Sequence, residues 1–211
     1  MSVWPGRAVR AQAVGRKGAA DERALVARAQ TGDHAAFEML YELHAGAVYA
    51  FIRLRVSDLD VAQEITQDVF VAAYRGLDRF EWQAGLAPWL MRIARNQVAN
   101  HWRTTSRRPQ LIRLPGEDDP EEAMPEIADA LDGALQAPDE LVMDLTEGHL
   151  QLAMQQLTEL QQQVVALRFG AEMSLQETAD VMGRSVNAVK NLQHKALGAL
   201  KRHLQPMGAE G

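Results

Sequence analysis

The chain contains no cysteine, which excludes disulfide bonds, thiol redox sensing and zinc sites built on cysteine ligands. Aromatic residues make up only 6% of its 211 residues. No apolar run approaches the roughly 20 residues that a membrane-spanning helix needs. Residues 1–20 hold basic side chains but no apolar core run, so they do not read as a secretory signal. These absences favour a cytoplasmic protein with no membrane insertion.

Charge of one sign is missing from whole stretches of the chain. The net charge is −6, yet residues 89–113 hold six arginines and no acid, and residues 181–204 also lack acids. Residues 117–147 hold twelve acids and no lysine or arginine, whereas residues 1–20 are basic. Local fields rather than the average charge govern binding. The pattern therefore predicts two cationic surfaces and one anionic segment.

The stretch 174–204 has the punctuation of two helices joined by a tight turn. Ser174 followed by Glu177 is the start of a capping box, and Gly183 can end the first helix in a left-handed conformation. Ser185 can cap the second helix. Such a pair is a helix-turn-helix, the motif that places its second helix in the DNA major groove.

The second helix of this pair presents a basic, amide-bearing outer face. Amides and amines can read base edges, and positive charges bind phosphates. An ordinary helical hairpin with a solvated polar face is the alternative. The DNA-contact candidates are Arg184, Ser185, Asn187, Lys190, Asn191, His194 and Lys195.

The first half of the chain has helical periodicity from Asp21, from His34 and from Asp58 to Tyr74. The last of these helices turns acids and amides outward. That row is either a solvated face or a docking face for a partner helix. Its members are Asp60, Gln63, Glu64, Gln67 and Asp68.

A loop at 76–86 precedes a helix from Ala87 to Arg103. Phe80 and Trp82 in the loop either close the core or offer a pocket for a nucleic-acid base. The helix has an apolar side that includes Trp102. Its opposite side has arginines without the acids that normally balance a solvated face, so it favours nucleic acid. These DNA-contact candidates are Arg92, Arg95, Asn96, Asn100 and Arg103.

Residues 104–138 contain five prolines among many acids, which predicts a mostly extended linker. At about 3.3 Å per residue it can span up to roughly 115 Å. The predicted fold is all-α, with two small helical domains on either side of this linker. The domains cover residues 21–103 and 139–204, and the tails are 1–20 and 205–211.

Six segments carry a resemblance to a known family. In the first half they are AFEMLYELHAGAVYAFIRLRV, DVAQEITQDVFVAAYRGLDRF and PWLMRIARNQVANHWR, and in the second half LTELQQQVVALRF, MSLQETADVMGRS and NAVKNLQHKAL. In order and spacing they resemble a bacterial RNA polymerase sigma factor of the extracytoplasmic-function (ECF, group IV) type. The resemblance covers roughly residues 21–204.

The resemblance implies a factor that binds core RNA polymerase and directs it to promoter DNA, without being an enzyme and without a cofactor. The first domain resembles sigma region 2, which binds the polymerase and opens the −10 element, with Phe80 and Trp82 at the opened DNA. The second resembles region 4, the −35 reader. An anti-sigma partner is also implied. The implied polymerase-binding residues are Asp60, Gln63, Glu64, Gln67, Asp68 and Phe70.

Two features depart from the family pattern. Thr158 stands where many members have proline, and with Gln161 it forms a capping-box start instead. The outer face of the last helix has Leu192 and Gln193 where many members carry an arginine and a leucine, so the −35 sequence cannot be read from this helix.

Two other classes of function compete with this interpretation. A stand-alone operator-binding regulator would use the helix-turn-helix alone, but no dimerisation coiled coil or ligand-sensing domain is evident. An enzyme would need a phosphate loop, a metal-spaced cluster or a nucleophile with its base, and none stands out. The six histidines are scattered, so no metal site is predicted.

Overall fold

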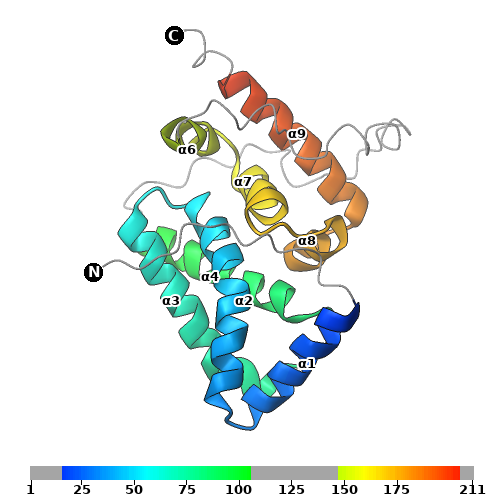
Figure 1. Cartoon of the computed structure of the whole chain (residues 1–211). Coiled ribbons are helices and arrows are strands. Elements are labelled where there is room, and N and C mark those ends of the chain that lie inside the picture. The colour runs from blue at the N-terminus through cyan, green and yellow to red at the C-terminus, as the bar shows by residue number, and fades with distance from the viewer. Residues whose placement is uncertain (1–15, 106–146, 205–211) are drawn as a thin grey trace.

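A computed structural model describes residues 16–105 and 147–204 of the chain, and these residues form two groups of helices (Figure 1). No strand occurs in either range, in agreement with the predicted all-α class. The predicted acidic linker lies almost wholly outside the described residues, as do residues 1–15 and 205–211.

The first group contains α1 (Arg16–Gln30), α2 (His34–Arg53), α3 (Leu59–Gly76), the 3₁₀ turn η1 (Leu77–Arg79) and α4 (Leu86–Thr105). The helices α3 and α4 are those expected from periodicity, with ends moved by one or two residues, and α2 begins at His34 as expected. The helix expected from residue 21 instead begins five residues earlier. The helix expected over 87–103 runs two residues further into the segment predicted to be linker.

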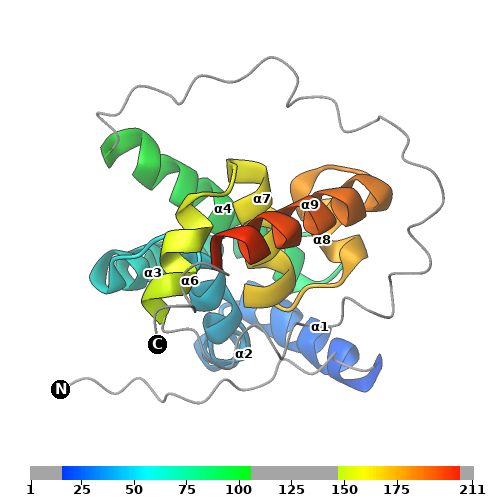
Figure 2. The same ribbon diagram turned by 90° about the horizontal axis from the view of Figure 1, so that it is seen from above.

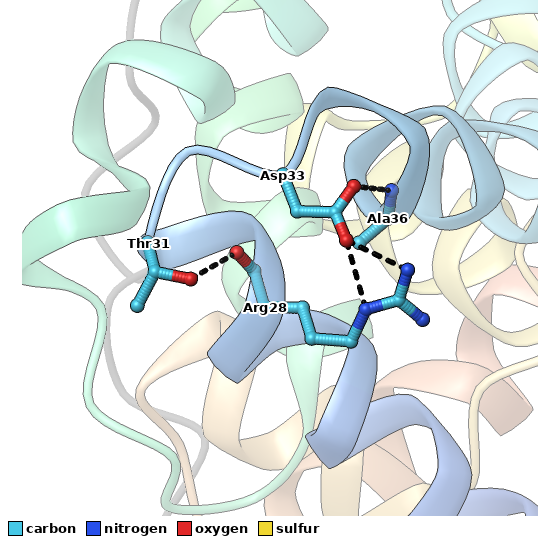
Figure 3. Close-up of polar contacts among 4 residues, drawn as sticks. All are labelled: Arg28, Thr31, Asp33 and Ala36. Atoms are coloured by element: carbon cyan, nitrogen blue, oxygen red, sulfur yellow. Dashed lines mark hydrogen bonds and ion pairs between the residues drawn. The ribbon is translucent and has the colours of Figure 1, made fainter.

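The turn between α1 and α2 is organised by Asp33 (Figure 3). One carboxylate oxygen of Asp33 accepts from the backbone N–H of Ala36 at 3.1 Å, which caps α2. The other accepts from two nitrogens of Arg28, at 2.7 and 2.9 Å. The hydroxyl of Thr31 donates to the Arg28 carbonyl at 2.8 Å. Together these bonds fix the shape of the turn and therefore the angle between α1 and α2.

The second group contains α6 (Glu147–Gln155), α7 (Glu159–Val165), the π-helical η2 (Ala166–Gly170), α8 (Leu175–Met182) and α9 (Val186–Leu204). The helix-turn-helix prediction is confirmed in α8 and α9. Sequence periodicity gave no sign of the π-helical turn that continues α7.

The predicted caps of the second group are present. Both capping boxes have their reciprocal bonds, one at Thr158 before α7 and one at Ser174 before α8. Gly183 ends α8 with φ 67°, and the Ser185 hydroxyl accepts from the Ala188 N–H at 3.2 Å at the start of α9. Local side-chain hydrogen bonds thus decide where these helices begin and end.

The apolar core crosses from one group to the other. Phe51, Ile52 and Leu90 are fully buried in the first group, and Leu167 and Val181 of the second group belong to the same cluster. Burial of each such side chain contributes about 1.5–3 kcal/mol. A second cluster closes α6, α7 and α9 around Val164 and Val189. The two predicted domains are therefore in contact in this arrangement, with α8 lying against α4 (Figures 1 and 2).

Two side chains lie where the sequence pattern did not put them. Trp102 was expected on the apolar side of α4 but is 43% exposed, because the last turn of α4 extends beyond its neighbours. Gln193 was expected on the outer face of α9 but is buried. Its amide oxygen accepts from Arg168 Nε at 2.9 Å, a partner that only the fold brings near.

Candidate nucleic-acid and polymerase interfaces

The polar side of α4 is the first candidate DNA surface. Arg92, Asn96, Asn100 and Arg103 are exposed, and Arg95 is half-buried. No acidic residue occurs within α4 to neutralise the arginines. Asn100 accepts a bond from Arg103, so the amide holds the guanidinium along the helix surface. The face predicted from spacing is therefore present as one stripe.

Two guanidinium groups of this stripe are engaged by the second group of helices. Arg92 Nη2 donates to the carbonyl of Asp180 at 3.3 Å, and Arg95 Nη1 donates to the carbonyl of Val181 at 2.8 Å. Both carbonyls lie in the last turn of α8. The sequence gave no indication of these contacts.

A pocket of about 260 Å³ opens beside the stripe, between the loop after η1 and the start of α4. Its volume lies just below the range of roughly 300–1,000 Å³ found for small-molecule sites, so it suits a ligand as small as one base. Its lining combines aromatic rings with two arginines. The lining residues are Arg79, Phe80, Glu81, Gln83, Ala84, Gly85, Pro88, Trp89 and Arg92.

The sequence left open whether the aromatic residues of the loop close the core or form a pocket, and the structure shows both. Phe80 is only 9% exposed and packs in the core, with ring centroids 5.0 Å from Trp89 and 6.1 Å from Trp82. Phe80 and Trp89 also line the pocket, whereas Trp82 is half-buried beside them and does not. The aromatic cluster thus closes the core and forms one wall of the pocket.

Gln30 at the end of α1 supports this pocket from behind. Its amide nitrogen donates to the carbonyls of Leu77 and Phe80, both at 2.9 Å. Gln30, Arg79, Glu81 and Trp89 were not predicted as site residues. A glutamine nearly fifty residues before the loop has no local signal that could have revealed this contact.

The outer face of α9 is the second candidate DNA surface. Asn187, His194 and Lys195 are exposed, and Lys190 and Asn191 are half-buried. Ser185 and Arg184 lie at the turn that precedes α9, where Ser185 also acts as the cap. No acidic residue occurs from Val181 to Leu204. The predicted set therefore shares one helix face and its N-terminal turn.

The outward face of α3 is the candidate polymerase-binding surface. Asp60, Gln63, Glu64, Gln67 and Asp68 are all exposed. Asp58 caps the helix by accepting from the backbone N–H groups of Asp60 and Val61, which fixes the phase of this face. Phe70 does not lie on it.

Phe70 is only 6% exposed, and its ring packs edge-on against Tyr41 at a centroid distance of 4.6 Å. Its position is that of a core residue which holds α3 against α2. Two other side chains of α3, Val71 and Tyr74, are about half exposed and extend the candidate polymerase-binding surface towards the C-terminal end of the helix.

Within the ranges that the structure describes, no group of three histidine, cysteine or acidic side chains could hold a metal ion. None of the helices placed there is both long and apolar enough to cross a membrane.

Two family models match separate parts of the chain. Sigma-70 region 2 matches residues 40–108, and Sigma-70, region 4 matches residues 153–202. The first contains α3, α4 and the pocket, and the second contains the helix-turn-helix.

Curated relatives extend the similarity to most of the chain. The ECF RNA polymerase sigma factor BldN of Streptomyces coelicolor is 35% identical over 181 residues, which cover 85% of this chain and 64% of the relative. The ECF RNA polymerase sigma factor SigX of Bacillus subtilis is 31% identical over 177 residues, which cover 82% of this chain and 86% of the relative.

Solved structures are similar in fold. CnrH in complex with the cytosolic domain of CnrY aligns with a TM-score of 0.63 and 24% identity, covering 88% of this chain and 97% of that one. The sigma factor RpoE in complex with the anti-sigma factor NepR from Bartonella quintana aligns with a TM-score of 0.58 and 22% identity, covering 80% and 96%.

Proposed function

Because the chain belongs to the ECF RNA polymerase sigma factors, a family of transcription initiation factors rather than enzymes, we propose that it reads two promoter elements through two separate helix faces. The observation that carries this assignment is the pair of acid-free polar faces on α4 and α9. Each face belongs to a different matched region, and each offers arginines or lysines for phosphates beside amides for bases.

The region 2 face acts at the −10 element. Asn96, Asn100 and Arg103 contact the strand that is opened, and one base leaves the stack to enter the pocket beside Trp89. Unstacking a base costs a few kcal/mol, and stacking of the base on the aromatic rings of the pocket offsets part of that cost. The arginines at the pocket rim hold the flanking phosphates.

The region 4 face acts at the −35 element. α9 enters the major groove with Asn187 and Asn191 towards base edges, while Lys190 and Lys195 bind the phosphate backbone. The exposed acids of α3 bind a basic partner helix of core polymerase. The protein acts in the cytoplasm, where the polymerase is.

The test is reconstitution with bacterial core RNA polymerase. The full chain is mixed with core enzyme, the complex is isolated by gel filtration, and transcription is measured on a random promoter library. Co-elution with selective transcription is expected and would reveal the −35 and −10 sequences. A folded chain that does not co-elute but binds free duplex tightly would instead support a stand-alone DNA-binding regulator.

An anti-sigma partner is part of the proposal. RpoE of Bartonella quintana was solved with the anti-sigma factor NepR, and its fold is similar to that of this chain. We expect a protein from the host to bind this chain and to displace core polymerase from it. Recovery of tagged chain from host cells, followed by competition with core polymerase, tests this. A bound protein that leaves holoenzyme formation unchanged would contradict it.

A further inference from the structure

Gln193 lies on the inward side of α9, away from the candidate DNA surface, and is only 7% exposed. Successive residues of a helix turn by about 100°, so Gln193 shares its side with the buried Val189 and Ala196. Asn187 and Asn191 point away from that side. A buried amide needs a hydrogen-bond partner within the protein, so Gln193 is held by something other than DNA.

The partner of Gln193 is the guanidinium of Arg168 in η2. Arg168 Nε donates to Gln193 Oε1 at 2.9 Å, and Arg168 Nη1 donates to the main-chain carbonyl of Met173. Met173 is buried in the segment that leads from η2 into α8. Hydrogen bonds from a charged donor are roughly twice as strong as neutral ones. One guanidinium thus connects α9 to the segment from which the first helix of the helix-turn-helix begins (Figure 1).

The π-helical turn η2 places Arg168 for this contact. Within the turn the Ala171 N–H donates to the Ala166 carbonyl, five residues earlier, at 2.9 Å. Single π-helical turns of this kind are frequent at functional sites. Ala166 and Leu167 are fully buried, so Arg168 extends from a part of the backbone that is fixed by packing.

The apolar contacts of α9 constrain its rotation less strictly than this hydrogen bond does. Val189, Ala196 and Leu200 pack in one cluster with residues of α6 and α7. Apolar burial is non-directional, so it opposes withdrawal of the helix more than a small rotation about the helix axis. A hydrogen bond weakens steeply as its angle closes. The bond between Arg168 and Gln193 therefore defines the rotational setting of α9.

The rotation of α9 decides which base edges its outer side chains can reach. In the proposed complex Asn187 and Asn191 contact bases, while Lys190 and Lys195 bind phosphates. A base-edge contact is a directional hydrogen bond, whereas a positive charge attracts phosphates over several ångströms. A small change in the rotation of α9 should therefore alter base recognition more than phosphate binding.

We propose that Gln193 is a positioning residue for recognition of the −35 element. Through the bond that it accepts from Arg168, it sets the rotation of α9 and so selects the base edges that Asn187 and Asn191 reach. The proposal rests on the function proposed above, because it requires α9 to read the −35 element. Gln193 itself contacts no DNA, since it is buried on the inward side of the helix.

Two substitutions at Gln193 separate the hydrogen bond from the size of the side chain. Gln193→Leu is similar in size but offers Arg168 no acceptor. Gln193→Glu keeps the acceptor and adds a negative charge that pairs with the guanidinium, so it should preserve the positioning. Gln162→Leu is the matched control. The Gln162 amide donates to the carbonyls of Met154 and Leu157, at 2.9 and 3.1 Å, and so braces α7 against the end of α6 rather than α9.

The measurement is the base preference of the holoenzyme at the −35 element. Each variant is assembled with core polymerase, and its affinity is measured for a promoter selected by the parent chain and for versions with each −35 base pair replaced in turn. For Gln193→Leu we expect discrimination at one or two of these positions to fall by about fivefold or more. The salt dependence of binding and the preference at the −10 element should not change. Gln193→Glu and Gln162→Leu should discriminate as the parent chain does.

Circular dichroism establishes that each variant is folded, and Gln193→Met, unbranched like glutamine, replaces the leucine variant if that one does not fold. Unchanged −35 preferences in the folded variant overturn the proposal. An equal loss of discrimination in Gln193→Glu or Gln162→Leu also overturns it, because the bond from Arg168 is then not the cause. A parent holoenzyme without any −35 preference counts against the proposed function itself, whereas a parent preference that survives Gln193→Leu counts only against the role of Gln193.

Discussion

Arg92 and Arg95 leave α4 on the same side, and the structure gives both of them a protein partner. Their hydrogen bonds to Asp180 and Val181 join residues more than eighty positions apart in the chain. A guanidinium group satisfied by main-chain carbonyls is positioned but not neutralised, because no acidic side chain pairs with it within the described residues. Hydrogen bonding at this scale therefore decides which guanidinium groups of the proposed DNA face are already engaged by the protein itself.

The lysines of α9 give a direct prediction. Replacement of Lys190 and Lys195 by alanine should weaken holoenzyme binding to the promoter and flatten its dependence on salt. The slope of log affinity against log salt should fall by about 0.9 for each lost phosphate contact. Filter binding over a range of salt concentrations measures this. Lys201→Ala, in the last turn of α9, serves as the control. An unchanged slope in the double variant would exclude phosphate contacts at these positions.

Asp33 gives a prediction about pH. The hydrogen bond that Asp33 accepts from the Ala36 N–H, together with the Arg28 guanidinium, lowers the pKa of the Asp33 carboxyl below its ordinary value. Because the folded-state pKa is the lower one, the stabilisation is present above the unfolded-state pKa and is lost as pH falls through the folded-state value. Asp33→Ala should therefore lower the melting temperature at neutral pH, and the difference from the parent chain should shrink below about pH 4.

Thermal melts of the two proteins across pH 2 to 7 provide the measurement. Asp78→Ala is the matched control, because Asp78 is exposed and caps no helix. A difference between Asp33→Ala and the parent chain that stays constant down to pH 2 would show that the ionised carboxylate does not act as the cap.

At the scale of the element, helix ends were predicted well because their causes are local. The capping residues Thr158 and Ser174 bond within three positions of themselves, and Gly183 needs only its own freedom at positive φ. The π-helical turn at η2 was not predicted. It places Gly170 against α2, and that partner lies more than one hundred residues earlier in the sequence.

The turn of the helix-turn-helix can be tested at Gly183. Its φ is 67°, and no atom lies within 4 Å of a Cβ built there, so substitution meets backbone strain but no clash. Gly183→Ala should lower the free energy of unfolding by about 1–2 kcal/mol. Urea denaturation measures the change. Gly148→Ala, within α6 and equally open, should be neutral or stabilising. Equal effects of the two variants would contradict this account.

Reversal of the charge on the outer face of α3 should weaken binding to core polymerase. Glu64→Lys combined with Asp68→Lys reverses two exposed charges one turn apart and should weaken holoenzyme formation at least about tenfold. Competition for core polymerase against a labelled parent chain measures this, with helicity checked by circular dichroism. Glu38→Lys is the control on α2. Normal holoenzyme formation by the folded double variant would place the docking face elsewhere.

For the whole molecule, the shared core predicts cooperative unfolding. Trp82, Trp89 and Trp102 lie in region 2 and no tryptophan lies in region 4, so the change in tryptophan fluorescence on unfolding reports on region 2, whereas circular dichroism reports on helices of both regions. Because Leu167 and Val181 complete the region 2 core, the two signals should give one midpoint in urea. Gly170→Ala should separate them into two midpoints. Two separate midpoints in the parent chain would show that the regions unfold independently.

By itself, the sequence determined the local features: the helices, their caps, the acid-free faces of α4 and α9, and the family. These depend on periodicity of about 3.6 residues, on side chains that bond to nearby backbone, and on charge within a single helix. The sequence did not distinguish buried Phe70 and Gln193 from exposed neighbours in their helices. Only the tertiary structure decided that, because burial depends on which other helix covers a face. It also decided that Gln30 supports the loop that lines the pocket and that α8 lies against Arg92 and Arg95, since these contacts join residues that no local pattern connects.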